Sequence, residues 1–404
     1  MEPKLTRASR LAVGILAVSL GAGVLQASDA WNPKSAARYL DQRESWWMAW
    51  PAATRDDGTF CVSCHTVAPY ALARPALRAA LGENAPAENE RRLLENVTKR
   101  VRLWKQIVPY YSESNGAEKP LQSRGTEAVL DALILAAADA RNGKLSQDTR
   151  AAFDHMWTEQ AKSGDQKGAW PWLDFGNEPF EAVDSVYYGA SLAAVAVGAA
   201  PENYRAAPEL QENLKALSDY IGRQCRSQSL IHQVVALWAA AKWPQVLSHA
   251  QQKAIVDDVL RKQKSDGGWG LSSLGWTWTG SSVRTIVDLW TRSNDSPWSG
   301  KSDGYATGLI VYVLGQAGVA LDDPHLQRGR SWLIRNQDQK EGLWPGFSMV
   351  NRRDPTSGTG RFMTDAATAY AVLALTANAS GFSLRHNRCE RSRQVMRYRI
   401  KETK

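Results

Sequence analysis

The chain has 404 residues, of which 44% are hydrophobic and 22% are charged. This composition indicates a folded protein with a sizeable core and excludes a disordered, low-complexity chain. The net charge is +8, but eight Lys or Arg against two Glu lie in residues 385–404, so the rest of the chain is nearly neutral and indicates no nucleic-acid partner. The 17 tryptophans outnumber the seven phenylalanines, which indicates an architecture that uses indole rings repeatedly.

Residues 1–28 have the pattern of a signal peptide. Three basic residues within the first ten precede an apolar run at 11–25, which is short for a membrane-spanning helix. Small residues at Ala27 and Ala30 suit cleavage, and an uncleaved N-terminal anchor is the alternative. We therefore expect an exported protein of the bacterial periplasm.

A helix with an aromatic face is predicted at 31–50, ended by Pro51. The sequence CVSCH follows at 61–65. Two cysteines separated by two residues, with a histidine directly after the second, are the attachment signature of a c-type haem. The chain thus resembles the c-type cytochromes. The resemblance implies one covalent haem on Cys61 and Cys64, with His65 as the proximal iron ligand.

Two other interpretations of the cysteine pair are a redox dithiol and half of a zinc site. A zinc site needs a second ligand pair, and the remaining cysteines, Cys225 and Cys389, are isolated. A dithiol of the thioredoxin type needs alternating strands and helices, which the pattern does not indicate. Cys225 and Cys389 form an even pair, so a disulfide between them is an open alternative in an oxidising compartment.

The distal iron ligand is not evident. Small electron-transfer cytochromes supply a methionine after the haem motif, but no Met or His occurs between His65 and His155. The candidates are Met48 upstream and His155 downstream, and the third alternative is a five-coordinate iron. A five-coordinate iron binds small ligands or supports peroxidase-like chemistry, whereas a six-coordinate iron mainly transfers electrons.

Two more helices are predicted before the chain changes character, at 69–81 with a break at Pro75 and at 87–107. We assign 29–115 to a helical haem-binding module and 116–384 to a second domain. The basic tail at 385–404 is expected to be disordered or to contact a membrane surface.

From residue 124 onward, Ala-, Leu- and Val-rich helices follow one another, each opening with an acidic or small polar residue. The openings are at Gly125, Asp184, Asp303 and Asp365, with a degenerate member at 231–243. Their spacing of roughly 55 to 60 residues, or about twice that, indicates a helical repeat array.

A second recurring feature is a glutamine at a helix end, followed by a turn and a tryptophan. The copies pair Gln160 with Trp170, Gln263 with Trp269, and Gln337 with Trp344. We expect the glutamine to satisfy backbone groups at one helix end and the indole to cap the next helix. The pattern resembles the glutamine-tryptophan repeats of the squalene-hopene cyclase and prenyltransferase superfamily. This resemblance implies an all-α fold, an α/α toroid with inner and outer helical rings around a cavity.

The parent activities of that superfamily are not expected here, because a fold does not carry its function with it. The Asp-x-Asp-Asp acid of the cyclases is absent, and Cys225, His232 and His249 lack a recognisable zinc spacing. Three hypotheses remain. The chain is a haem protein exchanging electrons with a periplasmic donor or acceptor, a haem-dependent oxidoreductase acting on an apolar or polymeric ligand in the toroid, or a lipid- or glycan-binding toroid with a structural or sensory haem.

Overall fold

The structure, a computed structural model, describes residues 30–274, 300–349 and 353–377. Within these ranges the chain is helical, with two isolated bridges and no strand. The predicted all-α class is therefore confirmed. No helix in the described part is long and apolar enough to cross a membrane. The predicted signal peptide, the basic tail and Cys389 lie outside these ranges.

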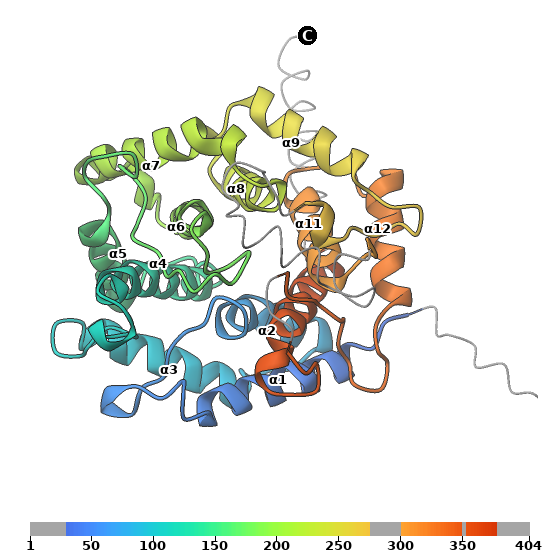
Figure 1. Ribbon diagram of the computed structural model, residues 1–404, viewed down its shortest axis with the longest axis horizontal. Helices are drawn as coiled ribbons and strands as arrows, with labels where there is room; N and C mark the ends of the chain where they lie inside the picture. Colours follow the sequence, from blue (N-terminus) through green and yellow to red (C-terminus); the bar gives the residue numbers. More distant parts are fainter. Residues whose placement is uncertain (1–29, 275–299, 350–352, 378–404) are drawn as a thin grey trace, which may run out of the picture.

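The helices form two layers that alternate along the chain, one inside the other (Figure 1). The outer helices are α1 (Pro33–Ala49), α3 (Glu88–Arg102), α5 (Gln147–Glu159), α7 (Gln211–Gln224), α9 (His249–Arg261) and α12 (Pro324–Arg335). The inner helices are α2 (Val67–Leu81), α4 (Lys119–Asp139), α6 (Ser185–Ala199), α8 (Leu230–Lys242), α11 (Gly304–Gln316) and a helix at 362–377. Inner helices pack on their neighbours in the order α2, α4, α6, α8 and α11.

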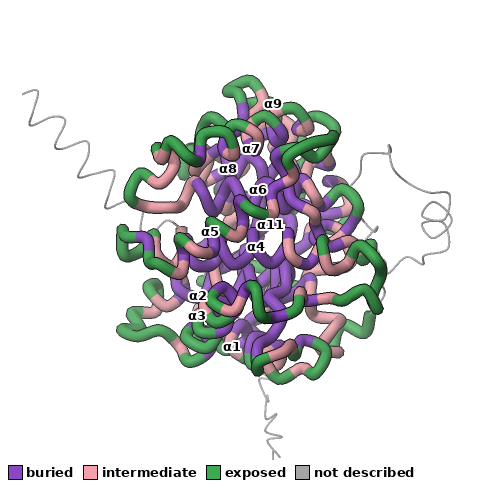
Figure 2. Tube along the Cα trace, turned by 90° about the vertical axis from the view of Figure 1, so that its left-hand side faces the viewer, coloured by how far each residue is buried: buried purple, intermediate pink, exposed green. Residues whose placement is uncertain are grey.

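The two layers differ in sequence pattern for a physical reason. Inner helices such as α6 and α11 are buried almost all round, and their residues are nearly all small or apolar. Outer helices such as α7 bury one stripe, formed there by Leu214, Leu217, Tyr220 and Ile221. Figure 2 shows the result, with a buried interior and exposed residues along the periphery. Small residues also set the spacing, since a Cβ at Gly308 would lie 2.6 Å from the backbone nitrogen of Ala371.

The segments that lead into the inner helices gather on one side of the molecule. His232, near the start of α8, has its Nε2 2.9 Å from the carbonyl oxygen of Pro179, which precedes α6. Gly304, which begins α11, donates its N–H to the carbonyl of Pro345, ahead of the helix at 362–377, at 2.9 Å. The N-termini of the inner helices therefore share one face, called the N-terminal face below. Helix N-termini carry partial positive charge, so this face favours anions.

The three glutamines of the recurring motif make the same two hydrogen bonds. Each side-chain amide donates to a glycine carbonyl in the turn after its own helix and to a carbonyl at the start of the next outer helix. The acceptors are Gly168 and Asn213 for Gln160, Gly267 and His325 for Gln263, and Gly342 and Asn32 for Gln337. Each glutamine thereby joins two successive outer helices.

The tryptophans of the motif hydrogen-bond to the helix that precedes them, not to the helix that follows. The indole N–H groups of Trp170, Trp269 and Trp344 donate to carbonyls of the preceding outer helix, those of Met156, Val259 and Leu333. The predicted cap on the next helix is therefore wrong. The reason is that the last turn of a helix leaves carbonyls without partners, and an indole can only donate.

The third copy of the motif joins the end of α12 to the start of α1. Gln337 accepts a hydrogen bond from the N–H of Asn32 at 2.6 Å and donates to its carbonyl at 3.0 Å. A Cβ at Gly342 would lie 2.1 Å from the carbonyl oxygen of Ser35, so only glycine fits. The outer layer therefore closes on itself through α1. The predicted domain boundary at 115/116 stays a prediction, and residues on both sides of it share this closed layer.

Replacing Gln337 with alanine is expected to lower the free energy of unfolding by about 1–3 kcal/mol, because the hydrogen bonds to Asn32 are lost in a partly buried place. Urea unfolding of the purified protein measures the change. Gln245→Ala, at an exposed position, is the matched control and should cost less than about 0.5 kcal/mol. Equal costs for the two variants would show that the closing contact contributes nothing.

Two expected helix boundaries need correction. Helix α2 runs from Val67 to Leu81 without a break at Pro75. A proline inside a helix costs about 3 kcal/mol, and burial of the surrounding Ala73, Arg74 and Leu77 outweighs it. The helix predicted at 87–107 ends already at Arg102, after which the chain turns. Helix α1, in contrast, matches its prediction.

Candidate functional site

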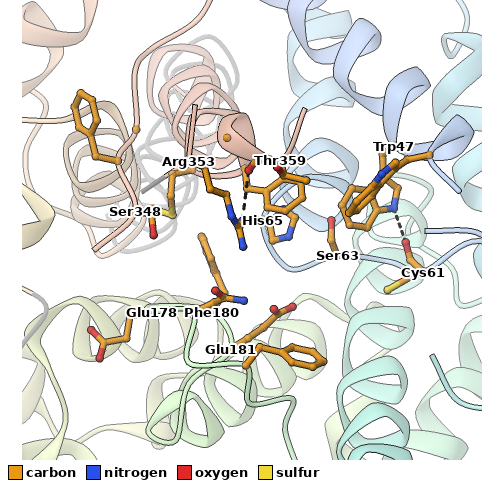
Figure 3. A pocket seen from close by; sticks show the side chains of 18 of the residues that line it. Trp47, Cys61, Ser63, His65, Glu178, Phe180, Glu181, Ser348, Arg353 and Thr359 are labelled. Carbon is orange, nitrogen blue, oxygen red and sulfur yellow. Dashed lines mark hydrogen bonds between the residues drawn. The ribbon is translucent and has the colours of Figure 1, made fainter. Parts of the chain in front are cut away.

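A pocket of about 850 Å³ lies at the N-terminal face (Figure 3). Its walls come from segments far apart in the sequence: α1, the motif at 61–65, residues 175–181 before α6, and residues 346–363. The lining is rich in aromatic side chains, among them Trp47, Trp50, Phe180 and Phe362. Its volume is within the range of roughly 300–1,000 Å³ that is typical of cofactor and small-molecule sites.

The motif at 61–65 forms part of this pocket and leads directly into α2. Cys61 and His65 line the pocket, and Cys64 is buried at 1% exposure. The indole of Trp47 donates to the carbonyl of Cys61 at 2.7 Å, a bond drawn in Figure 3. The hydroxyl of Ser63 accepts the N–H groups at the start of α2, which caps the helix.

The burial of the two thiols helps to decide whether the cysteine pair is a redox dithiol. Burial raises the pKa of Cys61 to about 12 and raises the pKa of Cys64 well above its ordinary value. A reactive dithiol is partly exposed and has a lowered pKa, so these cysteines do not have the surroundings of a redox pair. In the described ranges, no three His, Cys, Asp or Glu side chains are grouped so as to hold a metal ion.

His65 begins a chain of hydrogen bonds that ends on a buried carboxylate. Its Nδ1 lies 2.9 Å from the hydroxyl oxygen of Thr66, and that hydroxyl lies 2.7 Å from Oδ2 of Asp365. The hydroxyl of Thr66 donates to the carboxylate, so its oxygen accepts from Nδ1–H of His65. The remaining nitrogen, Nε2, carries no proton and is free to ligate a metal.

Three side chains from other segments, those of Arg43, Tyr39 and Thr66, donate hydrogen bonds to Asp365. Arg43 donates to both carboxylate oxygens, at 2.7 and 2.9 Å, and Tyr39 donates to one of them at 2.8 Å. Burial raises the pKa of Asp365, and the hydrogen bonds from Arg43 and Thr66 oppose the rise. With four donated hydrogen bonds, the group is held as a carboxylate. This clamp joins α1, Thr66 directly after the CVSCH segment, and the helix at 362–377.

Aromatic rings surround the imidazole of His65. The ring of Phe362 stacks on it at 3.9 Å between centroids, and Trp47 meets it edge-on at 5.3 Å. Stacking covers a face of the imidazole and leaves the ring edge, where Nε2 sits, free of that contact. Burial lowers the pKa of His65 to about 3, aided by Arg353 and Arg43, so the ring is neutral.

The structure separates the predicted distal ligands from the pocket. Neither Met48 nor His155 lines it. His155, on the outer helix α5, stacks on Trp104 with 4.7 Å between the ring centroids. The methionine that does line the pocket is Met363, which is 5% exposed and lies in the first turn of the helix at 362–377. Sequence reasoning missed it because no pattern in the chain indicates that residue 363 meets the segment at 61–65.

Charged side chains at the wall add two further chemical capacities. Burial raises the pKa of Glu181 to about 7, against a hydrogen bond from Asn177 and the charge of Arg353. A half-buried glutamate of this kind can take up or release a proton near neutral pH. Arg353 stacks over Phe362 at 5.3 Å and donates to the carbonyl of Thr359 (Figure 3). Its guanidinium can bind a carboxylate.

Behind the pocket, α1 buries Glu44, and neither of its carboxyl oxygens has a hydrogen-bond partner among the described residues. Burial, and then Asp365 and Asp41, raise its pKa from 4.5 to about 8. Between these two values the folded chain keeps a proton that the unfolded chain has lost. The stability contributed by protonated Glu44 is therefore complete below pH 4.5 and is lost as the pH rises toward 8.

Glu44→Gln removes this titration. The variant should exceed the wild type in free energy of unfolding by an amount that grows with pH, reaching roughly 1–4 kcal/mol at pH 8. Urea unfolding between pH 5 and pH 8 measures it. Glu95→Gln, on an exposed position of α3, is the control and should give a constant difference. A constant difference for Glu44→Gln as well would contradict the expectation.

Comparison with known proteins adds no relative. No family model matches the sequence, and no curated protein matches it. The chemistry of the pocket is therefore interpreted from its own residues.

Proposed function

We propose that this chain is an exported redox protein that carries one c-type haem in the pocket at the N-terminal face. Cys61 and Cys64 would hold the haem through thioethers, and His65 would ligate its iron. The observation that carries the proposal is the hydrogen-bond chain from His65 through Thr66 to Asp365, which leaves Nε2 unprotonated in a pocket lined by Cys61. The bound haem supplies one-electron redox chemistry.

The residues around the pocket fit a haem in size and character. The volume of about 850 Å³ and the aromatic walls suit a large planar ring. Asp365 and Thr66 orient the imidazole and increase its basicity as a ligand. Phe362 covers a face of the His65 imidazole and Trp47 packs edge-on against it, and these contacts would keep water from the ring. Arg353 can bind a propionate carboxylate at the pocket wall.

Met363 is the distal ligand that the pocket supports best, in place of Met48 and His155, because it alone of the three lines the pocket. With the His65 imidazole and the Met363 thioether both as ligands, a bound haem would be six-coordinate and would have a raised reduction potential. The protein would then mainly transfer electrons to or from a periplasmic partner.

Met363→Ala is expected to open the sixth position, lower the reduction potential and let carbon monoxide shift the spectrum of the reduced protein. Absorption spectroscopy and a redox titration measure these changes. Met48→Ala and His155→Ala are the matched variants and should keep the wild-type spectrum. If Met48→Ala or His155→Ala changes the spectrum and Met363→Ala does not, the residue replaced in that variant is the distal ligand.

The alternating helical layers support membership in the α/α toroids of the squalene-hopene cyclase and prenyltransferase superfamily, without their chemistry. Exposed Phe175 and Phe347 at the pocket, 38% and 47% accessible, suit contact with an apolar surface of an electron partner or an apolar ligand. The second candidate function is a haem-dependent oxidoreductase, which Glu181 favours because it can exchange a proton near neutral pH.

The test is expression of the full chain in cells that contain the cytochrome c maturation machinery. The purified protein should show a c-type absorption spectrum that survives denaturation and organic extraction. A wild-type spectrum that carbon monoxide does not shift supports electron transfer, and a shift supports the oxidoreductase. Protein that folds and is exported but carries no covalent haem would refute both functions.

A further inference from the structure

A continuous series of aromatic rings leads from the pocket into the inner layer. Phe180 lies 6.3 Å from His65 between ring centroids, and Tyr305 of α11 lies 5.3 Å from Phe180. Tyr370, from the helix at 362–377, follows at 5.7 Å from Tyr305. Tyr305 and Tyr370 are each at most 1% exposed. The first part of the series therefore runs through the centre of the molecule.

The series continues to the face opposite the pocket. Trp238 of α8 lies 6.5 Å from Tyr370, and Tyr312 of α11 lies 5.5 Å from Trp238. Tyr312 comes seven residues after Tyr305 on the same helix, which places it about 10 Å further along the axis. It is also near Arg141, which follows the C-terminal end of α4. Tyr312 is partly exposed, unlike Tyr305 and Tyr370, although burial still raises its pKa to about 12, so the series ends at its least buried phenol.

We propose that these rings conduct single electrons between Tyr312 and the haem pocket. The proposal rests on the second candidate function, the haem-dependent oxidoreductase, because a hydroperoxide must reach the haem and accept electrons there. The oxidant is a hydroperoxide. A haem held by Cys61, Cys64 and His65 would let hydrogen peroxide accept two electrons and two protons as its O–O bond breaks, which forms two water molecules. Tyr312 would supply one of these electrons along the series, release its phenolic proton to solvent and become a neutral tyrosyl radical, and the reduced haem would supply the other electron.

The surroundings of the hydroxyl groups explain why the oxidation ends at Tyr312. An oxidised phenol loses its proton, and the buried hydroxyl of Tyr305 has no hydrogen-bond partner among the described residues to take it. The hydroxyl of Tyr370 is hydrogen-bonded to Tyr188, which is equally buried. Of the three phenols in the series, Tyr312 alone is partly exposed, so its proton has the shortest way to water. Packing alone would be served as well by phenylalanine or leucine.

The experiment exposes the haem-loaded full-length protein to hydrogen peroxide with a nitroso spin trap. Radicals are recorded by electron paramagnetic resonance, and adducts are located by peptide mass spectrometry. The wild type should carry the trap on Tyr312, Tyr312→Phe should lose that adduct, and Trp238→Phe should reduce it about tenfold. Tyr220→Phe, at a buried ring of α7 outside the series, is the matched control and should leave the yield unchanged.

The outcomes separate this inference from the function on which it rests. Absence of a covalent haem spectrum before peroxide is added would overturn the proposed function. A normal spectrum and normal peroxide consumption, with adducts confined to Tyr111 at the pocket wall, would overturn the electron path alone. An unchanged yield at Tyr312 in Trp238→Phe would do the same. Haem-free protein treated with peroxide should show no adduct at Tyr312.

Discussion

Replacing both Cys61 and Cys64 with alanine is expected to reduce covalently bound haem from one per chain to none. In the proposed haem protein each thiol would supply one thioether, so removal of both would leave His65 as the only link between the CVSCH segment and the iron. A single non-covalent ligand does not survive denaturation. The measurement is haem staining of a denaturing gel, together with the pyridine haemochrome spectrum after acidic acetone extraction.

The two single-cysteine variants and a variant at a distant cysteine serve as comparisons for the double variant. Cys61→Ala and Cys64→Ala should each keep one thioether and a haemochrome band shifted relative to the wild type. Cys225→Ala removes another buried thiol and should keep the full haem content. Haem that remains attached in the double variant would show that the pair at 61 and 64 is not the attachment site.

Replacing Asp365 with alanine is expected to cost about 3–5 kcal/mol in free energy of unfolding. The substitution leaves the guanidinium of Arg43 buried without its carboxylate, and loss of one partner of a buried ion pair is costly. It also removes the acceptor for Thr66, so the imidazole of His65 loses its fixed orientation. Urea unfolding measures the first effect, and the absorption spectrum of the haem-loaded protein measures the second.

Two variants distinguish the clamp from a general loss of stability. Arg43→Met combined with Asp365→Leu removes both charges and should recover most of the stability but not the ligand orientation. Asp219→Ala breaks the exposed pair with Lys215 and should change stability by less than about 1 kcal/mol. A cost for Asp365→Ala as small as that of Asp219→Ala would mean that the clamp does not stabilise the fold.

The sequence pattern could predict the features that depend on neighbouring residues. The all-α class, helix α1 and the glutamine bonds of the recurring motif follow from periodicity and from the needs of helix ends. The predicted partner of the indole groups was wrong, because a pattern of Gln and Trp does not show which of two adjacent helix ends the indole contacts. The unbroken α2 shows burial overriding the local preference of Pro75.

The candidate site depends on contacts that no local pattern encodes. Thr66 meets Asp365 across a sequence separation of 299 residues, and the pocket gains Met363 only because the helix at 362–377 lies beside α2. Asp365 was visible in the sequence as a helix opening. Its role as the carboxylate behind His65 required the three-dimensional arrangement of both segments.

The closing contact between Gln337 and Asn32 also sets an order of events in time. During synthesis the N-terminal end of the chain emerges first, and α1 cannot meet α12 until more than three hundred residues have followed. Such distant pairings form slowly. Cys64, enclosed in the finished structure, would stay accessible to a haem-attaching enzyme throughout that interval. Attachment of the proposed cofactor would then precede closure, and a faster-closing variant would leave more of the protein without haem.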